Sequence, residues 1–184
     1  SGWWEQNNGN EFTLPYTKKS SLTRAVSRSN IENIKAGFVY PYHAIRSNAL
    51  IPDSFELSYD NGLFIGLFLA EGNANIKSGS VQITNNDETV QTFVKSWFDK
   101  HNINWKFDTR PNKIGGTTSY VIGKSSILAR LFTAMMGHTC YKKHVPDFAF
   151  IADKQFVSGL LNGYFSGDGT VGKNSIECCS ASER

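Results

Sequence analysis

Two short segments of the chain end in the same way, with an acid followed by glycine. They are FIGLFLAEG at residues 64–72 and LNGYFSGDG at residues 161–169. Each has glycine at its third position, an acid (Glu71 or Asp168) at its eighth and glycine at its ninth. One such helix alone would be an ordinary buried helix that ends at glycine, but two copies in the same register indicate a shared site.

The two acids predict a site for a divalent cation. An acid in the last turn of a helix faces the negative end of the helix dipole, at a cost of about 0.3–1 kcal/mol. Bringing Glu71 and Asp168 together adds to this cost, and a cation between them reverses it. Oxygen ligands suit a hard ion such as Mg²⁺ (or Mn²⁺). Beside a basic surface, such an ion suits phosphodiester hydrolysis.

Small residues predict how the two acids come together. Gly66 and Ala70 are four residues apart, as are Gly163 and Gly167. Residues four apart lie on one face of a helix. We therefore expect the two helices to touch backbone to backbone along these faces, with their C-terminal ends, and so the two acids, side by side.

The region between the acids predicts an α+β fold. Helical and alternating patterns follow one another from residue 57 onward, and Asp87 is the expected N-cap of the middle helix. The expected elements are a buried helix at 63–71, a hairpin at 73–85 that turns at Ser78–Gly79, an amphipathic helix at 87–102, two strands within 103–125 and a helix at 125–137 that closes on Gly137. A four-stranded antiparallel sheet follows, with the helices covering its apolar face.

The other face of this sheet is predicted to be polar with excess positive charge. It carries Asn75, Lys77, Ser80, Gln82, Thr84, Lys106, Asp108 and Arg110, and Lys113 follows in the next loop. An ordinary solvated sheet face is one interpretation. The other is a β-ribbon in the major groove of double-stranded DNA, where such residues contact base edges.

Residues 1–50 form a separate accessory segment by composition. Lys18, Lys19, Arg24 and Arg28 carry four positive charges with no acid between them. The segment is either a solvated surface or an arm that contacts DNA phosphates. The net charge of +3 is compatible with a nucleic-acid partner but is weak support alone.

Cysteine and hydrophobic content set the expected compartment. Three cysteines without framework spacing predict an intracellular chain with reduced thiols. His138, Cys140 and His144 match no common zinc pattern and lack a fourth ligand, so we do not expect a zinc site. The apolar run at 63–70 is far shorter than the roughly 20 residues that span a bilayer, and no membrane association is predicted.

These features together resemble the LAGLIDADG homing endonucleases. The two nine-residue segments stand in the register of the family motif, and the expected element order matches its αββαββα half. KKHVPD at 142–147 resembles the Lys-x-Val-Pro element of endonucleases embedded in inteins. The resemblance covers residues 57–184. It implies a first half at 51–150 and the start of a second, incomplete half at 151–184.

The resemblance implies site-specific cleavage of both strands of a DNA target, with Mg²⁺ as cofactor. Glu71 and Asp168 would be catalytic metal ligands, with glutamate replacing the commoner aspartate in the first motif. Lys143 would polarise the attacking water or stabilise charge on the phosphate. The alternative for Lys143 is an ordinary surface lysine.

Three further interpretations stay open. The chain is either a cleaving endonuclease or a DNA-binding module that no longer cuts. It is also interpretable as one piece of a split intein or endonuclease, which needs the missing C-terminal portion or a second chain. Residues 1–50 would be a DNA-recognition region or an intein remnant, and no splicing nucleophile with a downstream His–Asn pair is evident.

Overall fold

The computed structural model describes residues 56–178 except His138 and Ile151, together with short strands before them. Those strands are β1 (Glu5–Asn7), β2 (Glu11–Thr13), β3 (Phe38–Val39), β4 (Ile51–Pro52) and β5 (Ser54–Glu56). β2 pairs with both β1 and β5, and β3 pairs with β4. The basic residues of the predicted arm, Lys18, Lys19, Arg24 and Arg28, lie outside the described residues.

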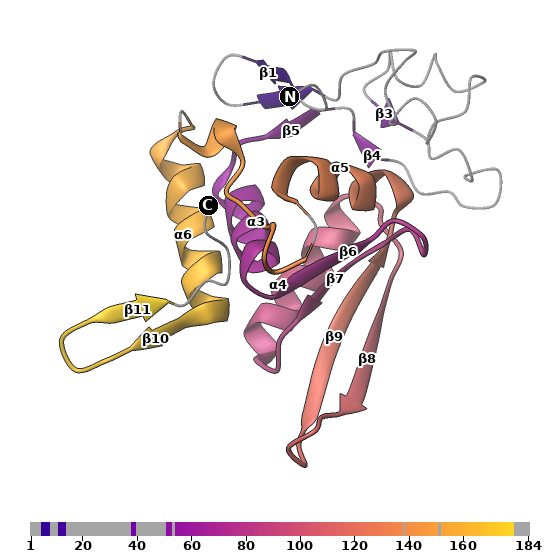
Figure 1. Cartoon of the computed structure of the whole chain (residues 1–184). Coiled ribbons are helices and arrows are strands. Elements are labelled where there is room, and N and C mark those ends of the chain that lie inside the picture. Colours follow the sequence, from indigo (N-terminus) through magenta and orange to yellow (C-terminus); the bar gives the residue numbers. More distant parts are fainter. Residues whose placement is uncertain are drawn as a thin grey trace.

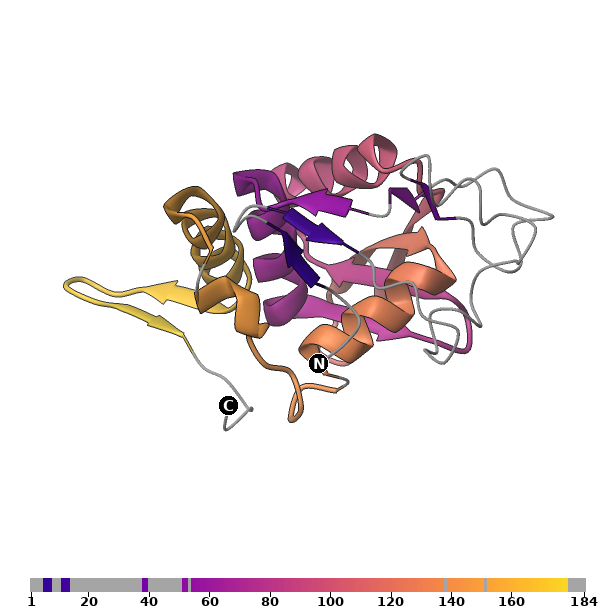
Figure 2. The same cartoon turned by 90° about the horizontal axis from the view of Figure 1, so that it is seen from above.

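A four-stranded antiparallel sheet forms the centre of the molecule, as predicted. Its order is β6 (Gly72–Asn75), β7 (Ser80–Thr84), β9 (Thr117–Lys124) and β8 (Trp105–Pro111). The helices α3 (Tyr59–Glu71), α4 (Glu88–Lys100) and α5 (Ser126–Met136) pack against it, and Figures 1 and 2 show the layers. Val81, Ile83 and Val121 face these helices and are buried with them in one core.

The sequence explains where two of these helices begin. The Asp87 carboxylate accepts hydrogen bonds from the backbone N–H groups of Thr89 and Val90, so it is the N-cap of α4 as predicted. The Ser125 side chain accepts from the N–H of Leu128 and starts α5 in the same way. α5 ends at Gly137, whose φ of 82° lies in the region that glycine tolerates best.

α3 is longer than the predicted helix at 63–71. It begins at Tyr59, because the Ser58 side chain caps the N–H of Asn61. Phe64 then stacks on Trp97 of α4 with ring centroids 3.7 Å apart. This contact holds α3 against α4 on the helical side of the sheet.

The first hairpin is shorter than predicted. β6 ends at Asn75, and a turn at Ile76–Gly79 precedes β7. The Asn75 side chain accepts from the N–H of Ser78, and Gly79 has a φ of 59°, which together close the turn early. Lys77 therefore lies on the turn and not on the strand face.

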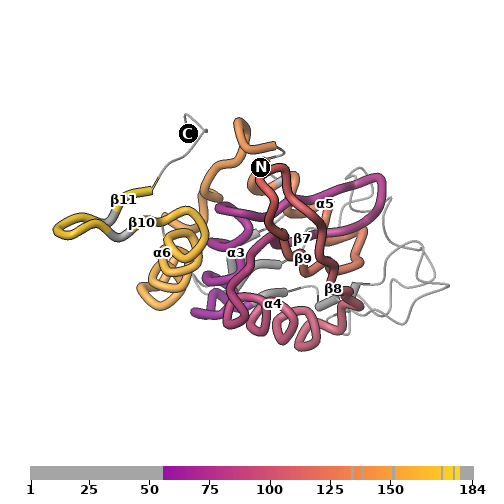
Figure 3. Tube along the Cα trace, turned by 90° about the horizontal axis from the view of Figure 1, so that it is seen from below, coloured from indigo at the N-terminus to yellow at the C-terminus, as the bar shows by residue number. Residues whose placement is uncertain are grey.

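The second acid lies at the end of a long helix that runs beside α3. The chain passes through a 3₁₀ turn, η3 (Asp147–Phe150), into α6 (Lys154–Asp168). It continues into an antiparallel hairpin of β10 (Gly169–Val171) and β11 (Ile176–Cys178). Figures 1 and 3 show this hairpin projecting from the end of α6, away from the central sheet.

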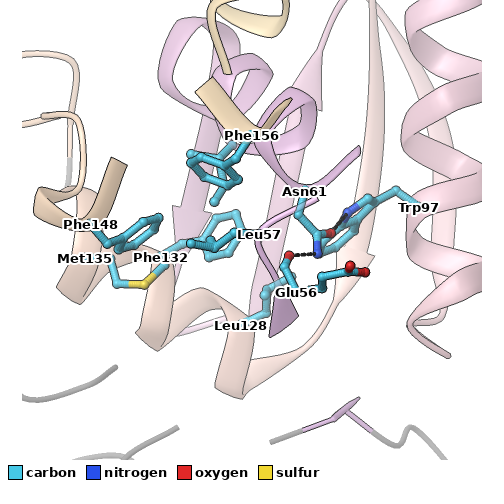
Figure 4. Close-up of a pocket in the computed structure, with 10 residues that line it drawn as sticks. Glu56, Leu57, Asn61, Trp97, Leu128, Phe132, Met135, Phe148 and Phe156 are labelled. Carbon is cyan, nitrogen blue, oxygen red and sulfur yellow. Dashed lines mark hydrogen bonds between the residues drawn. The ribbon is translucent and has the colours of Figure 1, made fainter. Parts of the chain in front are cut away.

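A small apolar pocket lies beside the N-terminal half of α3 (Figure 4). Phe132, Phe148 and Phe156 are among the side chains that line it. Asn61 adds a polar group, but its side chain accepts from Trp97 Nε1 at 2.9 Å and donates to a backbone carbonyl. The pocket is at the opposite end of α3 from Glu71, so the chemistry of the two acids lies elsewhere.

No helix in the described part of the chain has both the length and the apolar character needed to cross a bilayer.

Candidate active site

Glycines bring the backbones of α3 and α6 into contact. A methyl group at Gly66 would collide with the carbonyl oxygen of Leu160, and one at Gly163 would collide with that of Leu63. The N-terminal residues of one helix meet the N-terminal residues of the other, so the helices are parallel. Their C-terminal ends therefore lie at the same end of the pair.

Two further glycines of this interface were not predicted from the sequence. Gly62 faces the carbonyl oxygen of Phe156, and Gly159 faces that of Tyr59. Both continue the four-residue spacing one turn toward the N-terminus, at the same 97-residue offset that separates Gly66 from Gly163. The repeat was thus visible in the sequence, and extending it by one turn would have found both residues.

The C-terminal ends of the pair place the two acids close together. A methyl group at Gly167 would lie 2.5 Å from Cβ of Ala70 and 3.2 Å from Cγ of Glu71. Asp168 follows Gly167 directly, and its charge contributes to raising the pKa of Glu71. Glu71 directly precedes Gly72, the first residue of β6, so the acids lie beside the start of this edge strand.

Burial shifts the pKa of both acids upward. For Glu71, burial raises the pKa most and Asp168 adds to it, whereas the hydrogen bond from Asn85 and the charge of Lys143 lower it. For Asp168, burial raises the pKa and Lys143 lowers it. Each acid is therefore harder to ionise than usual, and a positive charge at this position stabilises the ionised pair.

Lys143 lies beside both acids. Its ammonium group donates hydrogen bonds to the backbone carbonyls of Phe68 at 2.8 Å and Leu69 at 3.1 Å. These carbonyls belong to the last turn of α3, which has no basic residue of its own. Lys143 therefore offsets the negative end of the α3 dipole, where Glu71 also lies.

Burial lowers the pKa of Lys143, while the charges of Asp168, Cys140 and Glu71 raise it. The loop that carries the lysine is folded back on the end of α5. The N–H of Lys143 donates to the carbonyl of Thr139, and the N–H of His144 donates to the carbonyl of Met136. This loop is what fixes the lysine at the end of α3.

Asn85 is a further residue of the site that the sequence reasoning missed. Its side-chain amide donates to Oε2 of Glu71 at 2.8 Å. Its Oδ1 accepts from the N–H of Asp87, and its carbonyl accepts from the buried Gln91 side chain at 2.9 Å. An asparagine just after a strand carries no distinctive pattern, so only its contact with Glu71 identifies it.

The oxygen donors fit a hard divalent cation. Within residues 56–178, except His138 and Ile151, no group of three His, Cys, Asp or Glu side chains converges. Mg²⁺ does not need three, because it keeps several waters and is commonly held by one or two carboxylates with substrate phosphate. Glu71 and Asp168 supply such a pair.

The strand register gathers most of the predicted DNA contacts on one sheet face. Residues directly opposite on antiparallel strands share a face. Asn75 of β6 is opposite Ser80 of β7. Ile122 of β9 is flanked by Gln82 of β7 and Lys106 of β8, and Tyr120 of β9 is flanked by Thr84 of β7 and Asp108 of β8. Arg110 of β8 lies on the same face, opposite Thr118. Asn73, Thr118, Tyr120 and Lys124 share this face and were not predicted.

Ser80 is an exception among the predicted DNA contacts, because its side chain is buried. It points to the polar face but is 92% buried, since only 8% of its surface is exposed, and its hydroxyl is within 2.7 Å of that of Ser78. The acid of the face is paired, because Asp108 binds Arg110 at 2.8 Å and lies 3.9 Å from Lys106. Lys113 lies in the loop between β8 and β9. The remaining charge on this face is positive.

Comparison with known proteins gives sequence relatives and structural likenesses. The chain is 37% identical over 122 residues to the DNA-directed RNA polymerase subunit Rpo1C of Methanocaldococcus jannaschii. The aligned stretch covers 66% of this chain and 14% of that subunit, so the chain spans about one seventh of the relative's length. No protein-family model matches the chain.

Two solved structures have similar folds over 62% of this chain. Full-length DUF199/WhiA from Thermatoga maritima has a TM-score of 0.43 at 12% identity, with 34% of that chain covered. I-DmoI, solved in complex with DNA and Mn, has a TM-score of 0.43 at 15% identity, with 64% of that chain covered.

Proposed function

We propose that the chain is part of a LAGLIDADG-type homing endonuclease that hydrolyses DNA phosphodiester bonds with a divalent cation. The observation that carries this proposal is the convergence of Glu71, Asp168 and Lys143 at the ends of two helices packed through glycine. Two carboxylates and one ammonium group suit a reaction in which negative charge builds on a phosphate.

In this mechanism the carboxylates of Glu71 and Asp168 would hold the cation, and the Asn85 amide, which donates to Oε2 of Glu71, fixes the orientation of that carboxylate. When bound, the cation lowers the pKa of a water molecule and neutralises charge on the attacking and leaving oxygens. The ammonium group of Lys143 lies beside both acids and stabilises the charge that develops on the phosphate. Packing of α3 against α6 sets the distance between the two carboxylates.

The polar sheet face holds the DNA in this proposal. β6 begins directly after Glu71, so duplex DNA lying on the sheet passes the two acids. Lys106, Arg110 and Lys124 contact phosphates or guanines, and Gln82 and Asn75 are suited to bidentate contacts with adenine. The pairing of Asp108 with Arg110 removes the main repulsive charge from this surface.

The outer face of α6 exposes apolar side chains that a second sheet, like the one packed on α3, would cover. Leu161 and Phe165 are 48% and 36% exposed, although they stand 97 residues after Phe64 and Phe68, which are fully buried. On α3, those two positions pack against the sheet and helices of its half. We propose that further strands and helices, from the same protein or a second chain, cover Leu161 and Phe165 and extend the β10–β11 hairpin.

The sequence relative suggests the DNA to test. A homing endonuclease of an intein lies inside its host protein, and this chain matches a limited stretch of a polymerase subunit. We therefore propose that the target is the coding sequence of such a subunit without the inserted element. The predicted intein association rests on this match and on Lys143 in its Lys-x-Val-Pro element.

Cleavage of that DNA tests the proposal. The protein carrying this chain is incubated with a duplex that encodes the uninterrupted subunit, with Mg²⁺ or Mn²⁺ and with EDTA. We expect metal-dependent cleavage at one position, lost in Glu71→Gln and Asp168→Asn. Glu88→Gln, in the exposed first turn of α4, is the matched control and retains cleavage.

The alternative of a non-cleaving DNA-binding module gives a different outcome. Such a module binds the duplex with a steep dependence on salt but leaves it intact with either metal. Equal behaviour of the wild type and the acid variants, with cleavage absent from all three, would therefore favour the binding module over the enzyme.

A further inference from the structure

The hairpin of β8 and β9 carries a feature that the proposed catalysis does not use. Figure 1 shows this hairpin running well beyond the helices that cover the rest of the sheet. Thr109, Arg110 and Pro111 at its far end are exposed, as is Thr117 on the partner strand. An isolated two-stranded ribbon is marginally stable in water, so its extension calls for something to lie against it.

The turn at the tip of this hairpin is held in one conformation. The Asn112 side chain accepts hydrogen bonds from the N–H groups of Ile114 at 3.1 Å and Gly116 at 2.8 Å. The backbone N–H of Asn112 donates to the carbonyl of Gly116 at 2.8 Å, and Gly115 has a φ of 85°. Residues 112–116 thus form a closed loop with a hydrogen-bonded backbone.

This loop presents one large apolar side chain to solvent. Ile114 is 92% exposed, the highest value of any large hydrophobic residue in the described part of the chain. Single exposed apolar residues are common on proteins. Ile114 differs because a hydrogen-bonded turn holds it at the end of a ribbon, with Lys113 beside it and Arg110 at the end of the strand.

We propose that Ile114 is a specificity-determining residue that packs against a thymine C5-methyl group in the DNA major groove. A two-stranded ribbon fits this groove, where the thymine methyl is the apolar feature of the base edges. The basic residues of the ribbon supply the charge that draws it to DNA. This inference rests on the DNA-binding function proposed above and adds a contact that reads sequence.

Selection from a randomised duplex library tests the inference without knowledge of the target. The protein that carries this chain is incubated with the library in EDTA, so that binding is measured without cleavage. We expect the wild type to enrich thymine at one position, and Ile114→Ala to lose the preference at that position alone. Its affinity for the selected duplex falls about five- to tenfold.

Replacing that thymine by deoxyuridine removes the methyl group and keeps the base pair. The wild type then loses affinity by the same factor, and Ile114→Ala loses nothing further, because both changes remove one contact. Lys113→Ala behaves differently: it weakens binding to all sequences alike and lowers the salt slope by about one.

A matched variant and the wild type separate the possible failures. Phe150→Ala truncates another exposed apolar residue, 78% exposed on η3, and should leave both preference and affinity unchanged. If wild type and Ile114→Ala select the same bases with equal affinity, the inference about Ile114 is wrong and the DNA-binding function stands. If the wild type binds no duplex at all, the proposed function itself is wrong.

Discussion

Replacing Lys143 by methionine should destabilise the protein even when no metal and no DNA are present. Methionine keeps much of the length of the side chain but cannot donate to the carbonyls of Phe68 and Leu69, which Lys143 contacts at 2.8 and 3.1 Å. It also removes the positive charge of Lys143, which lowers the pKa of both acids. The last turn of α3 then has no cation to offset its dipole.

The size of the effect follows from these contacts. A hydrogen bond to a charged group contributes about 1.5–3 kcal/mol, and the half-buried position of Lys143 reduces that value because water replaces part of the loss. Two such bonds and the attraction to the acids are offset in part by the cost of burying the ammonium group, which is also what lowers its pKa, so the net destabilisation is about 1–3 kcal/mol. For a chain of this size, the melting temperature should fall by roughly 2–12 °C.

The assay is thermal and urea denaturation in EDTA at neutral pH. Lys142→Met is the matched control, because Lys142 is the exposed neighbour and should change the melting temperature little. Burial lowers the pKa of Lys143, so the native state binds fewer protons than the unfolded state as the pH rises toward the ordinary lysine range. Wild-type stability should therefore rise with pH in that window, and this rise should be absent from Lys143→Met.

Equal melting temperatures for Lys143→Met and Lys142→Met would refute this reasoning. Lys143 would then contribute nothing to α3, and any loss of cleavage in the variant would come from the chemical step alone. Loss of both stability and cleavage would instead show that the lysine supports the helix end on which Glu71 is held.

Three further predictions concern the same site. Gly66→Ala should destabilise the protein by about 2–4 kcal/mol in urea denaturation, since the added methyl group meets the α6 backbone, whereas Ser158→Ala on the exposed side of α6 should be nearly neutral. Glu71→Gln should raise the melting temperature by about 1–3 °C in EDTA at neutral pH, because a carboxyl group with a raised native pKa costs stability once the pH exceeds its ordinary pKa. Mg²⁺ should stabilise the wild type but not this variant. If Mg²⁺ instead stabilises the variant and not the wild type, the metal site is contradicted. Asn85→Ala should weaken Mg²⁺ binding about 10-fold by calorimetry while leaving Asp168 in place, and unchanged binding would show that the amide does not position Glu71.

The element types were predictable because they depend on local patterns. Alternation in Val81 and Ile83 predicted a strand, and Asp87 predicted the start of α4, since each signal lies within a few residues of the structure it specifies. Element ends were less predictable. The start of α3 at Tyr59 depends on the cap by Ser58, and the early end of β6 depends on a side-chain contact within its turn.

The candidate site was predictable only in part. Repetition of glycine and acid at a 97-residue offset identified Glu71 and Asp168 and indicated two helices that touch. The same repetition did not lead us to Gly62 and Gly159, because their turn lies outside the nine-residue segments. The roles of Glu71 and Asp168 in metal binding and cleavage stay predictions.

By itself, the sequence determined which segments become helices and strands, and it set the matched positions of the two acids. These properties depend on side-chain type and spacing along a single element. Only the tertiary structure decided what surrounds Glu71: Asn85 arrives from the end of a strand, and Lys143 arrives from a loop more than 70 residues later. Such contacts depend on how separate elements pack together. The Lys-x-Val-Pro element indicated Lys143, but no local pattern indicated Asn85 or the α3 carbonyls that Lys143 contacts.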